Sequence, residues 1–139
     1  MKKTVIITGA TDGIGKALAI LLAKDYNLAL CGRSKDKMNS LIQELGECDV
    51  YSECFDITSD SSRHDFCEHV KAKFGTVDVL VNNAGIAHIG LLTDMTPDEW
   101  HRIMHTNLDS CFYTCRLAIP LMLKKHSRGV GDAKIELHG

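Results

Sequence analysis

The sequence predicts an α/β fold built on a doubly wound, mostly parallel sheet. Three observations carry this prediction: short apolar runs, stretches with apolar residues at helical spacing, and turn residues wherever one pattern replaces the other. Strands that alternate with helices in this way form right-handed βαβ units. The chain has 139 residues and 45% hydrophobic content, which suits one ordinary domain.

Four strands are predicted where short apolar runs lack a helical period. They are expected at residues 4–8, 28–31, 50–55 and 77–81. The first and the fourth are almost wholly apolar, as is typical of strands buried on both faces of a parallel sheet. Asn27 is expected to break the preceding helical pattern, so that the second strand starts at Leu28.

Three helices are predicted between these strands, because apolar residues recur there three or four positions apart. They are expected at residues 14–24, at residues 35–45 and, after the cap-type residues 58–60, up to Phe74. Gly46 and Gly75 follow the second and third helices and suit their C-terminal stops.

A fourth, longer helix is predicted over residues 97–125. Thr96 suits the N-cap, Pro97 suits the first helical position, and Glu99 completes a capping box. Pro120 is expected to bend this helix or to cost it a hydrogen bond.

Residues 126–139 contain glycines and polar residues but no strong apolar run. Because such a segment is unlike a central strand, we expect an atypical C-terminal tail after a partial domain at residues 1–125. The expected strand order is 3-2-1-4, with the sheet truncated after the long helix and the fourth strand left as a bare edge.

The composition excludes several classes of function. The 16 Lys and Arg residues and 18 Asp and Glu residues form no block of one sign, so neither nucleic acid nor membrane is an expected partner. The six cysteines lack CxxC spacing and no signal peptide is evident, so we expect reduced thiols in a cytoplasmic protein. His101 and His105 lack a third ligand, and no metal site is expected.

A glycine-rich turn follows the first strand. Residues 8–15 read Thr-Gly-Ala-Thr-Asp-Gly-Ile-Gly, with glycines where a chain must turn tightly, admit a pyrophosphate and pack a helix on a strand. The helix that follows directs its free N–H groups at such phosphates. The alternative is a tight turn that binds no ligand. Because the three glycines come directly after a buried strand, a Rossmann-like dinucleotide site is favoured.

Arg33 stands at the end of the second strand, where an NAD site would place an acidic residue on the ribose 2′-hydroxyl. A guanidinium can hold a 2′-phosphate through charge-assisted, often bidentate hydrogen bonds. The sequence therefore favours NADP(H) over NAD(H). A solvated loop arginine is the alternative interpretation.

Residues 82–85 read Asn-Asn-Ala-Gly and follow the fourth strand. Together with the TGxxxGxG turn, in this order and at this spacing, the segment closely resembles the short-chain dehydrogenase/reductase family. The resemblance runs from Thr4 to about Leu123. It implies a dinucleotide cofactor and an oxidoreductase lineage.

The turn, Arg33 and the resemblance together define a set of expected cofactor-binding residues. They are Thr8, Gly9, Thr11, Asp12, Gly13, Ile14, Gly15, Arg33, Asp56, Ile57, Asn83, Ala84 and Gly85. By the resemblance, Asp56 lies near the adenine, Ile57 supplies a backbone contact beside it, and residues 82–85 contact the adenosine ribose. Asn107 is expected to be catalytic, holding a water in the proton-relay path. Asp12 argues against NADP(H), because many NADP-selective relatives carry a basic residue there.

The rest of the family's active site is absent from this sequence. Family members continue with a serine at the end of a fifth strand and a Tyr-x-x-x-Lys pair, and no tyrosine here is followed four positions later by lysine. A positioned acid or base is worth about 10²–10⁴-fold in rate. We therefore expect the NADP(H)-binding part of an oxidoreductase, whose full-length form transfers hydride between NADP(H) and a small carbonyl or alcohol substrate. Whether the chain alone is an enzyme stays open.

A non-catalytic nucleotide-binding or dimerisation module is the alternative function. In the family that the chain resembles, the helix that corresponds to residues 97–125 builds much of the dimer interface. Several apolar residues of this helix would also lack a covering segment. We therefore expect a homo-oligomer that forms through this helix.

Overall fold

A computed structural model describes residues 2–125 and 134–137 of the chain. The strands are β1 (Lys3–Thr8), β2 (Tyr26–Gly32), β3 (Val50–Cys54), β4 (Val79–Asn82) and β5 (Lys134–Leu137). The helices are α1 (Gly13–Leu22), α2 (Lys35–Leu45), α3 (Asp60–Phe74), α4 (Pro97–Met104) and α5 (Ser110–Lys125). A short 3₁₀ turn, η1 (Leu92–Asp94), and a π-helical turn, η2 (His105–Asp109), complete these elements.

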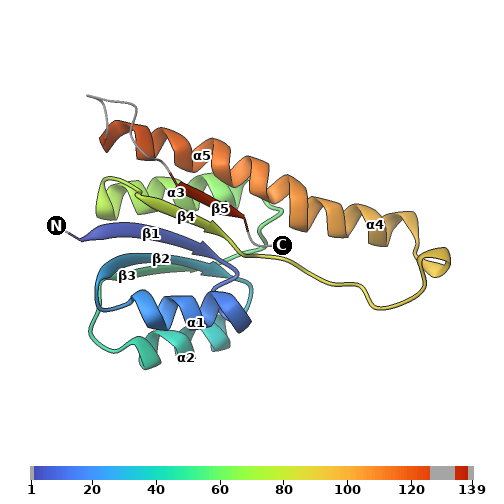
Figure 1. Cartoon of the computed structure of the whole chain (residues 1–139), viewed down its shortest axis with the longest axis horizontal. Helices are drawn as coiled ribbons and strands as arrows, with labels where there is room; N and C mark the ends of the chain where they lie inside the picture. Colours follow the sequence, from blue (N-terminus) through green and yellow to red (C-terminus); the bar gives the residue numbers. More distant parts are fainter. Residues whose placement is uncertain (1, 126–133, 138–139) are drawn as a thin grey trace.

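All the strands run parallel in one sheet of order β3-β2-β1-β4-β5. Helices α1 and α2 cover one face, and α3 and α5 cover the other (Figure 1). This arrangement confirms the predicted doubly wound α/β fold and the order 3-2-1-4 of its first four strands. The carboxyl ends of β1, β2 and β4 consequently meet at one edge of the sheet, where open α/β sheets bind their ligands.

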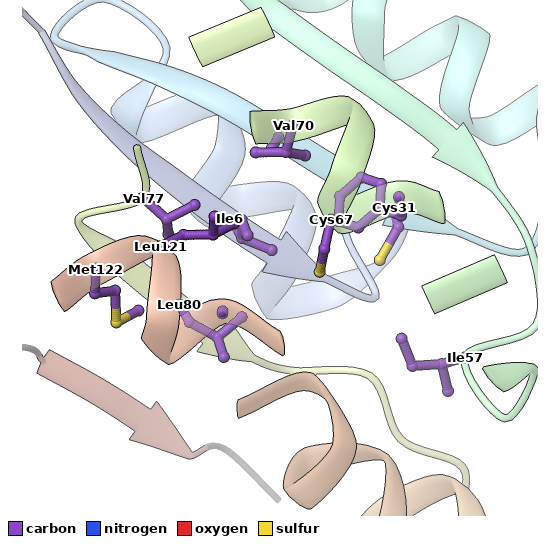
Figure 2. Close-up of a cluster of buried hydrophobic side chains, with 12 residues drawn as sticks. Ile6, Cys31, Ile57, Cys67, Val70, Val77, Leu80, Leu121 and Met122 are labelled. Carbon is purple, nitrogen blue, oxygen red and sulfur yellow. The ribbon is translucent and has the colours of Figure 1, made fainter. Parts of the chain in front are cut away.

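The alternation of side chains along the central strands divides the core into two layers. Ile6 of β1 packs with Val70 of α3 and Met122 of α5 on one face (Figure 2). Val5 and Ile7, its neighbours along β1, pack on the opposite face against the layer of α1 and α2. Because both faces are buried, the register of β1 is fixed against slippage.

The prediction that the fourth strand is a bare edge is wrong. Strand β5 pairs in parallel with β4, from Val79 opposite Lys134 to Asn82 opposite Leu137. Backbone pairing needs only N–H and C=O groups, so the Lys-Ile-Glu-Leu segment joins the sheet without the apolar run that marks central strands. The other residues of the predicted tail, 126–133 and 138–139, lie outside the described residues.

The second strand begins two residues earlier than the predicted start at Leu28. Asn27 lies within β2, opposite Thr4 of β1. Its side-chain amide donates to Thr4 Oγ1 at 3.3 Å, which satisfies a polar group that would otherwise disfavour a strand. Strand β2 therefore begins at Tyr26, before the apolar run.

The segment predicted as one long helix is divided by a π-helical turn. The Thr96–Glu99 capping box is present: Thr96 Oγ1 accepts from the Glu99 amide at 3.2 Å, and a Glu99 carboxylate oxygen accepts from the Thr96 amide at 2.9 Å. The π-helical turn η2 then separates α4 from α5, although the apolar period gives no sign of it. Pro120 lies within α5 and does not end it.

Candidate functional site

A cleft of about 570 Å³ opens at the carboxyl ends of β1, β2 and β4. Its walls come from the glycine turn, the end of β2 with the start of α2, the loop after β3 and the segment after β4. The lining residues are Gly9, Thr11, Asp12, Gly13, Ile14, Cys31, Gly32, Arg33, Ser34, Lys37, Phe55, Asp56, Ile57, Asn83, Ala84, Gly85, Ile86 and Thr106. The structure thus brings all the expected cofactor-binding residues except Thr8 and Gly15 to one cavity.

The glycine turn has the shape that a bound pyrophosphate requires. Gly9 and Gly13 adopt φ values of 63° and 52°, which residues with a Cβ atom rarely adopt. A Cβ atom on Gly9 would lie 2.8 Å from the Cα atom of Ala84, and one on Gly15 would collide with the Gly9 carbonyl oxygen. Beside Gly13, by contrast, the space is open to 4 Å. The residues present therefore fit a dinucleotide whose phosphates lie along the turn at the start of α1.

Thr8 and Asn83 fasten the turn to the end of β4. Thr8 Oγ1 accepts hydrogen bonds from the amides of Asn83 and Ala84, each at 3.0 Å. The Asn83 side chain donates to the Gly9 carbonyl oxygen at 3.0 Å. Thr8 is buried and does not line the cavity, but its hydrogen bonds fix the position of Asn83 and Ala84, which do. These bonds join the glycine turn to the Asn-Asn-Ala-Gly segment that follows β4.

The end of β2 brings a cationic group to the same cleft. Arg33 is exposed there, and Ser34 caps α2 by accepting from the Lys37 amide at 3.3 Å. The Lys37 ammonium lies 2.8 Å from a carboxylate oxygen of Asp12. Sequence reasoning missed Ser34 and Lys37 as cavity residues. A serine before a helix, with a lysine three positions later, was the available signal.

Asp56 and Ile57 form the wall of the cleft next to Arg33. Asp56 accepts hydrogen bonds from the Thr58 amide at 3.0 Å and the Thr58 hydroxyl at 2.8 Å. These bonds, helped by the charges of Arg33 and Arg102, hold the pKa of the Asp56 carboxyl below its ordinary value. Asp56 is therefore an anion at neutral pH, able to accept a hydrogen bond from a nucleoside.

Asn107 lies in η2, beyond the cleft wall formed by Thr106. The Asn107 side-chain oxygen Oδ1 accepts from the Ile86 backbone amide at 2.8 Å, and the side-chain nitrogen Nδ2 donates to the Ile86 backbone carbonyl oxygen at 2.8 Å. The pair of bonds fixes the segment after β4 against the long helix. The expected role of Asn107 in holding a water stays a prediction.

Other reactive side chains have structural surroundings. Burial raises the pKa of the Cys67 thiol to about 11, and burial likewise raises that of Cys31, so both thiols act as small apolar groups. Among residues 2–125 and 134–137, no group of three or more His, Cys, Asp or Glu side chains is arranged to hold a metal ion. Within the same residues, no helix has the length and apolar character needed to span a bilayer.

Comparison with known proteins identifies the lineage of this fold and cleft. The profile of the short chain dehydrogenase family matches residues 3–130. The chain is 34% identical to the 3-oxoacyl-[acyl-carrier-protein] reductase FabG of Thermotoga maritima over 133 residues, covering 92% of this chain and 53% of that protein. It is 40% identical to the D-beta-hydroxybutyrate dehydrogenase of Rhizobium meliloti over 130 residues, covering 90% of this chain and 50% of that protein.

A solved structure gives the same result. The alcohol dehydrogenase of the archaeon Thermococcus sibiricus, complexed with 5-hydroxy-NADP, is 32% identical and superposes with a TM-score of 0.79. The alignment covers 89% of this chain and 55% of that one, so the chain spans about half the length of the relatives that it matches. The matched half is the nucleotide-binding portion, and the chain belongs to the short-chain dehydrogenase/reductase family.

Proposed function

We propose that this chain binds NADP(H) and forms the cofactor-binding part of an enzyme that transfers hydride between NADP(H) and a carbonyl or alcohol substrate. Residues 1–125 are the cofactor-binding unit in this proposal. The observation that carries it is that the glycine turn, from Gly9 to Ile14, and Arg33 line one cleft. The turn has room for phosphates, and the guanidinium supplies a charge for a further phosphate on the ribose.

Each wall of the cleft has a part in the proposed binding. The free N–H groups at the start of α1 face the pyrophosphate, and the positive end of the helix dipole favours its charge. Asp56 and the backbone of Ile57 meet the adenine, while residues 83–85 meet the adenosine ribose. A bound dinucleotide would supply the hydride. Asn107, next to the lining residue Thr106, would hold a water on the proton path.

NADP(H) is preferred to NAD(H) in this proposal because Arg33 stands where an acidic residue would bind a free ribose hydroxyl. The Thermococcus relative, whose structure contains an NADP derivative, supports the same preference. The sequence contains no Tyr-x-x-x-Lys pair, so we expect these 139 residues to bind the dinucleotide without rapid carbonyl reduction. A cytoplasmic location suits such a protein and its reduced thiols.

Titration of the purified chain with NADPH and NADH tests the proposal. We expect NADPH to bind more tightly, and Arg33→Ala to weaken NADPH binding by about tenfold or more while changing NADH binding little. Arg116→Ala, which removes an exposed arginine of α5, is the matched control and should leave both affinities unchanged. Equal, weak binding of the two dinucleotides by the wild-type chain would overturn the assignment.

A second candidate function is a dimerisation or interaction module that uses the long helix. The exposed fractions of Leu108 and Phe112 favour it, at 57% and 62%. These side chains line a shallow, mostly apolar groove together with Asp109, Cys111, Tyr113 and Cys115. A surface of this kind fits a second copy of the same helix.

A further inference from the structure

Lys37, in the first turn of α2, lines the proposed cofactor cleft although it is not among the cofactor-binding residues predicted from the sequence. It is the third residue of α2, and its backbone amide donates to the Ser34 side chain that caps this helix. Its ammonium lies 2.8 Å from the carboxylate of Asp12, which belongs to the glycine turn at the far end of β1. Lys37, Asp12 and Arg33 all line the same cavity. Two segments 25 positions apart in sequence therefore meet beside Arg33.

The negative charge of Asp12 is unfavourable beside a phosphate site, and the positive charge of Lys37 offsets it. A carboxylate on a turn that receives phosphates repels them, because like charges at close range disfavour binding. The Lys37 ammonium neutralises this carboxylate. An ammonium group also has three donors, so Lys37 can keep its bond to Asp12 and still donate to a phosphate oxygen. The side chains are 56% and 68% exposed, which leaves the ammonium open to a ligand.

The neighbouring lysines are less suited to this role. Lys16 lines an adjoining hollow of about 430 Å³, which Asp12, Asp36 and Lys37 also line, and its ammonium pairs with Glu44 at 3.2 Å. Lys35 is exposed at the start of α2 and does not line the cleft. Among these three lysines, Lys37 is thus the one that lines the same cleft as Arg33.

We propose that Lys37 is a second cation for the ribose 2′-phosphate and that Asp12 anchors it at the cleft. Arg33 would bind the phosphate as a planar fork, and Lys37 would bind it as a compact point charge. This inference rests on the proposed function, because it assigns a specificity residue to the same cleft.

Calorimetric titration with adenosine 2′,5′-bisphosphate and adenosine 5′-monophosphate isolates the 2′-phosphate without the nicotinamide. We expect Lys37→Met to weaken binding of the bisphosphate by about tenfold and binding of the monophosphate by less than about twofold. Lys35→Met is the matched control and should leave both affinities unchanged. The same Tm for all variants would show that the fold is retained.

A double-mutant cycle with Asp12→Asn separates direct contact from neutralisation of Asp12. If Lys37 contacts the phosphate, Lys37→Met will cost about tenfold in the Asp12→Asn background as well. Loss of that effect would overturn the contact, as would equal losses for the two nucleotides in the single variant. If Arg33→Ala removes the preference for the bisphosphate while Lys37→Met does not, this inference fails and the proposed function stands. No preference in the wild-type chain would overturn both.

Discussion

Arg63 is a charged residue buried in the packing between α3 and α5, with an exposed fraction of 3%. Its guanidinium donates to the Ile57 carbonyl oxygen at 2.6 Å and lies 4.7 Å from the centre of the Tyr113 ring. It also pairs with Asp60, whose side chain is mostly exposed. Through these contacts Arg63 connects the loop that lines the cleft to the long helix.

Replacement of Arg63 by alanine should lower the free energy of unfolding by about 2–4 kcal/mol, because it leaves a buried carbonyl without a donor and creates a cavity. Asp60→Asn should cost less than about 1 kcal/mol, since an exposed ion pair contributes little. Chemical denaturation of both variants measures the difference. Equal losses would show that the ion pair with Asp60 dominates, contrary to this expectation.

At the scale of the elements, the first strands and helices could be predicted closely from the spacing of apolar residues along the chain. Helix α2 begins and ends at the predicted residues, because Ser34 and Gly46 mark its two ends in the sequence. The cavity residues of the glycine turn were likewise predictable, since Gly9 needs a positive φ that leaves a visible glycine. Local chemistry determines these features, and local chemistry can be read from the sequence.

Other elements depend on partners that lie far away in the chain. Strand β5 is held by its backbone pairing with β4, which no property of residues 134–137 announces. The same is true of the Lys37 ammonium, whose position follows from the distant Asp12. The π-helical turn η2 contains Asn107, whose side chain forms two hydrogen bonds with the backbone of Ile86, 21 positions away. An extra residue in a helical turn at such a site commonly accompanies function.

Asn107→Ala should therefore release the segment after β4. Losing two hydrogen bonds at about 1 kcal/mol each predicts a loss of about 2 kcal/mol in stability. Hydrogen exchange at the Ile86 amide should become faster, because its acceptor is removed. Asn39→Ala, at an exposed position on α2, is the control and should change neither quantity. Unchanged protection of Ile86 in the Asn107 variant would contradict the proposed fastening.

At the scale of the whole molecule, helices on both faces of the sheet expose apolar side chains to solvent, but the exposed side chains are arranged differently on the two faces. On the side of α3 and α5, the long helix carries Leu108, Phe112 and Leu123 with more than half of each side chain exposed. On the opposite side, Leu21 of α1 is an exposed residue of similar character, at 74%. The difference is that Leu108 and Phe112 adjoin one groove, whereas Leu21 adjoins no described groove of this kind.

If the long helix binds a second copy of the chain, a second carboxylate in the groove should prevent assembly, because it would be buried without a partner, whereas Asp109 pairs with His105. Phe112→Glu should shift the protein from dimer to monomer at micromolar concentration in sedimentation velocity. Leu21→Glu adds the same charge to the other face and should leave the dimer intact. A Phe112 variant with unchanged Tm but a lower sedimentation coefficient would separate loss of assembly from loss of folding. A wild-type chain that stays monomeric and well folded at high concentration would rule out the interaction module and leave nucleotide binding as the function of this fold.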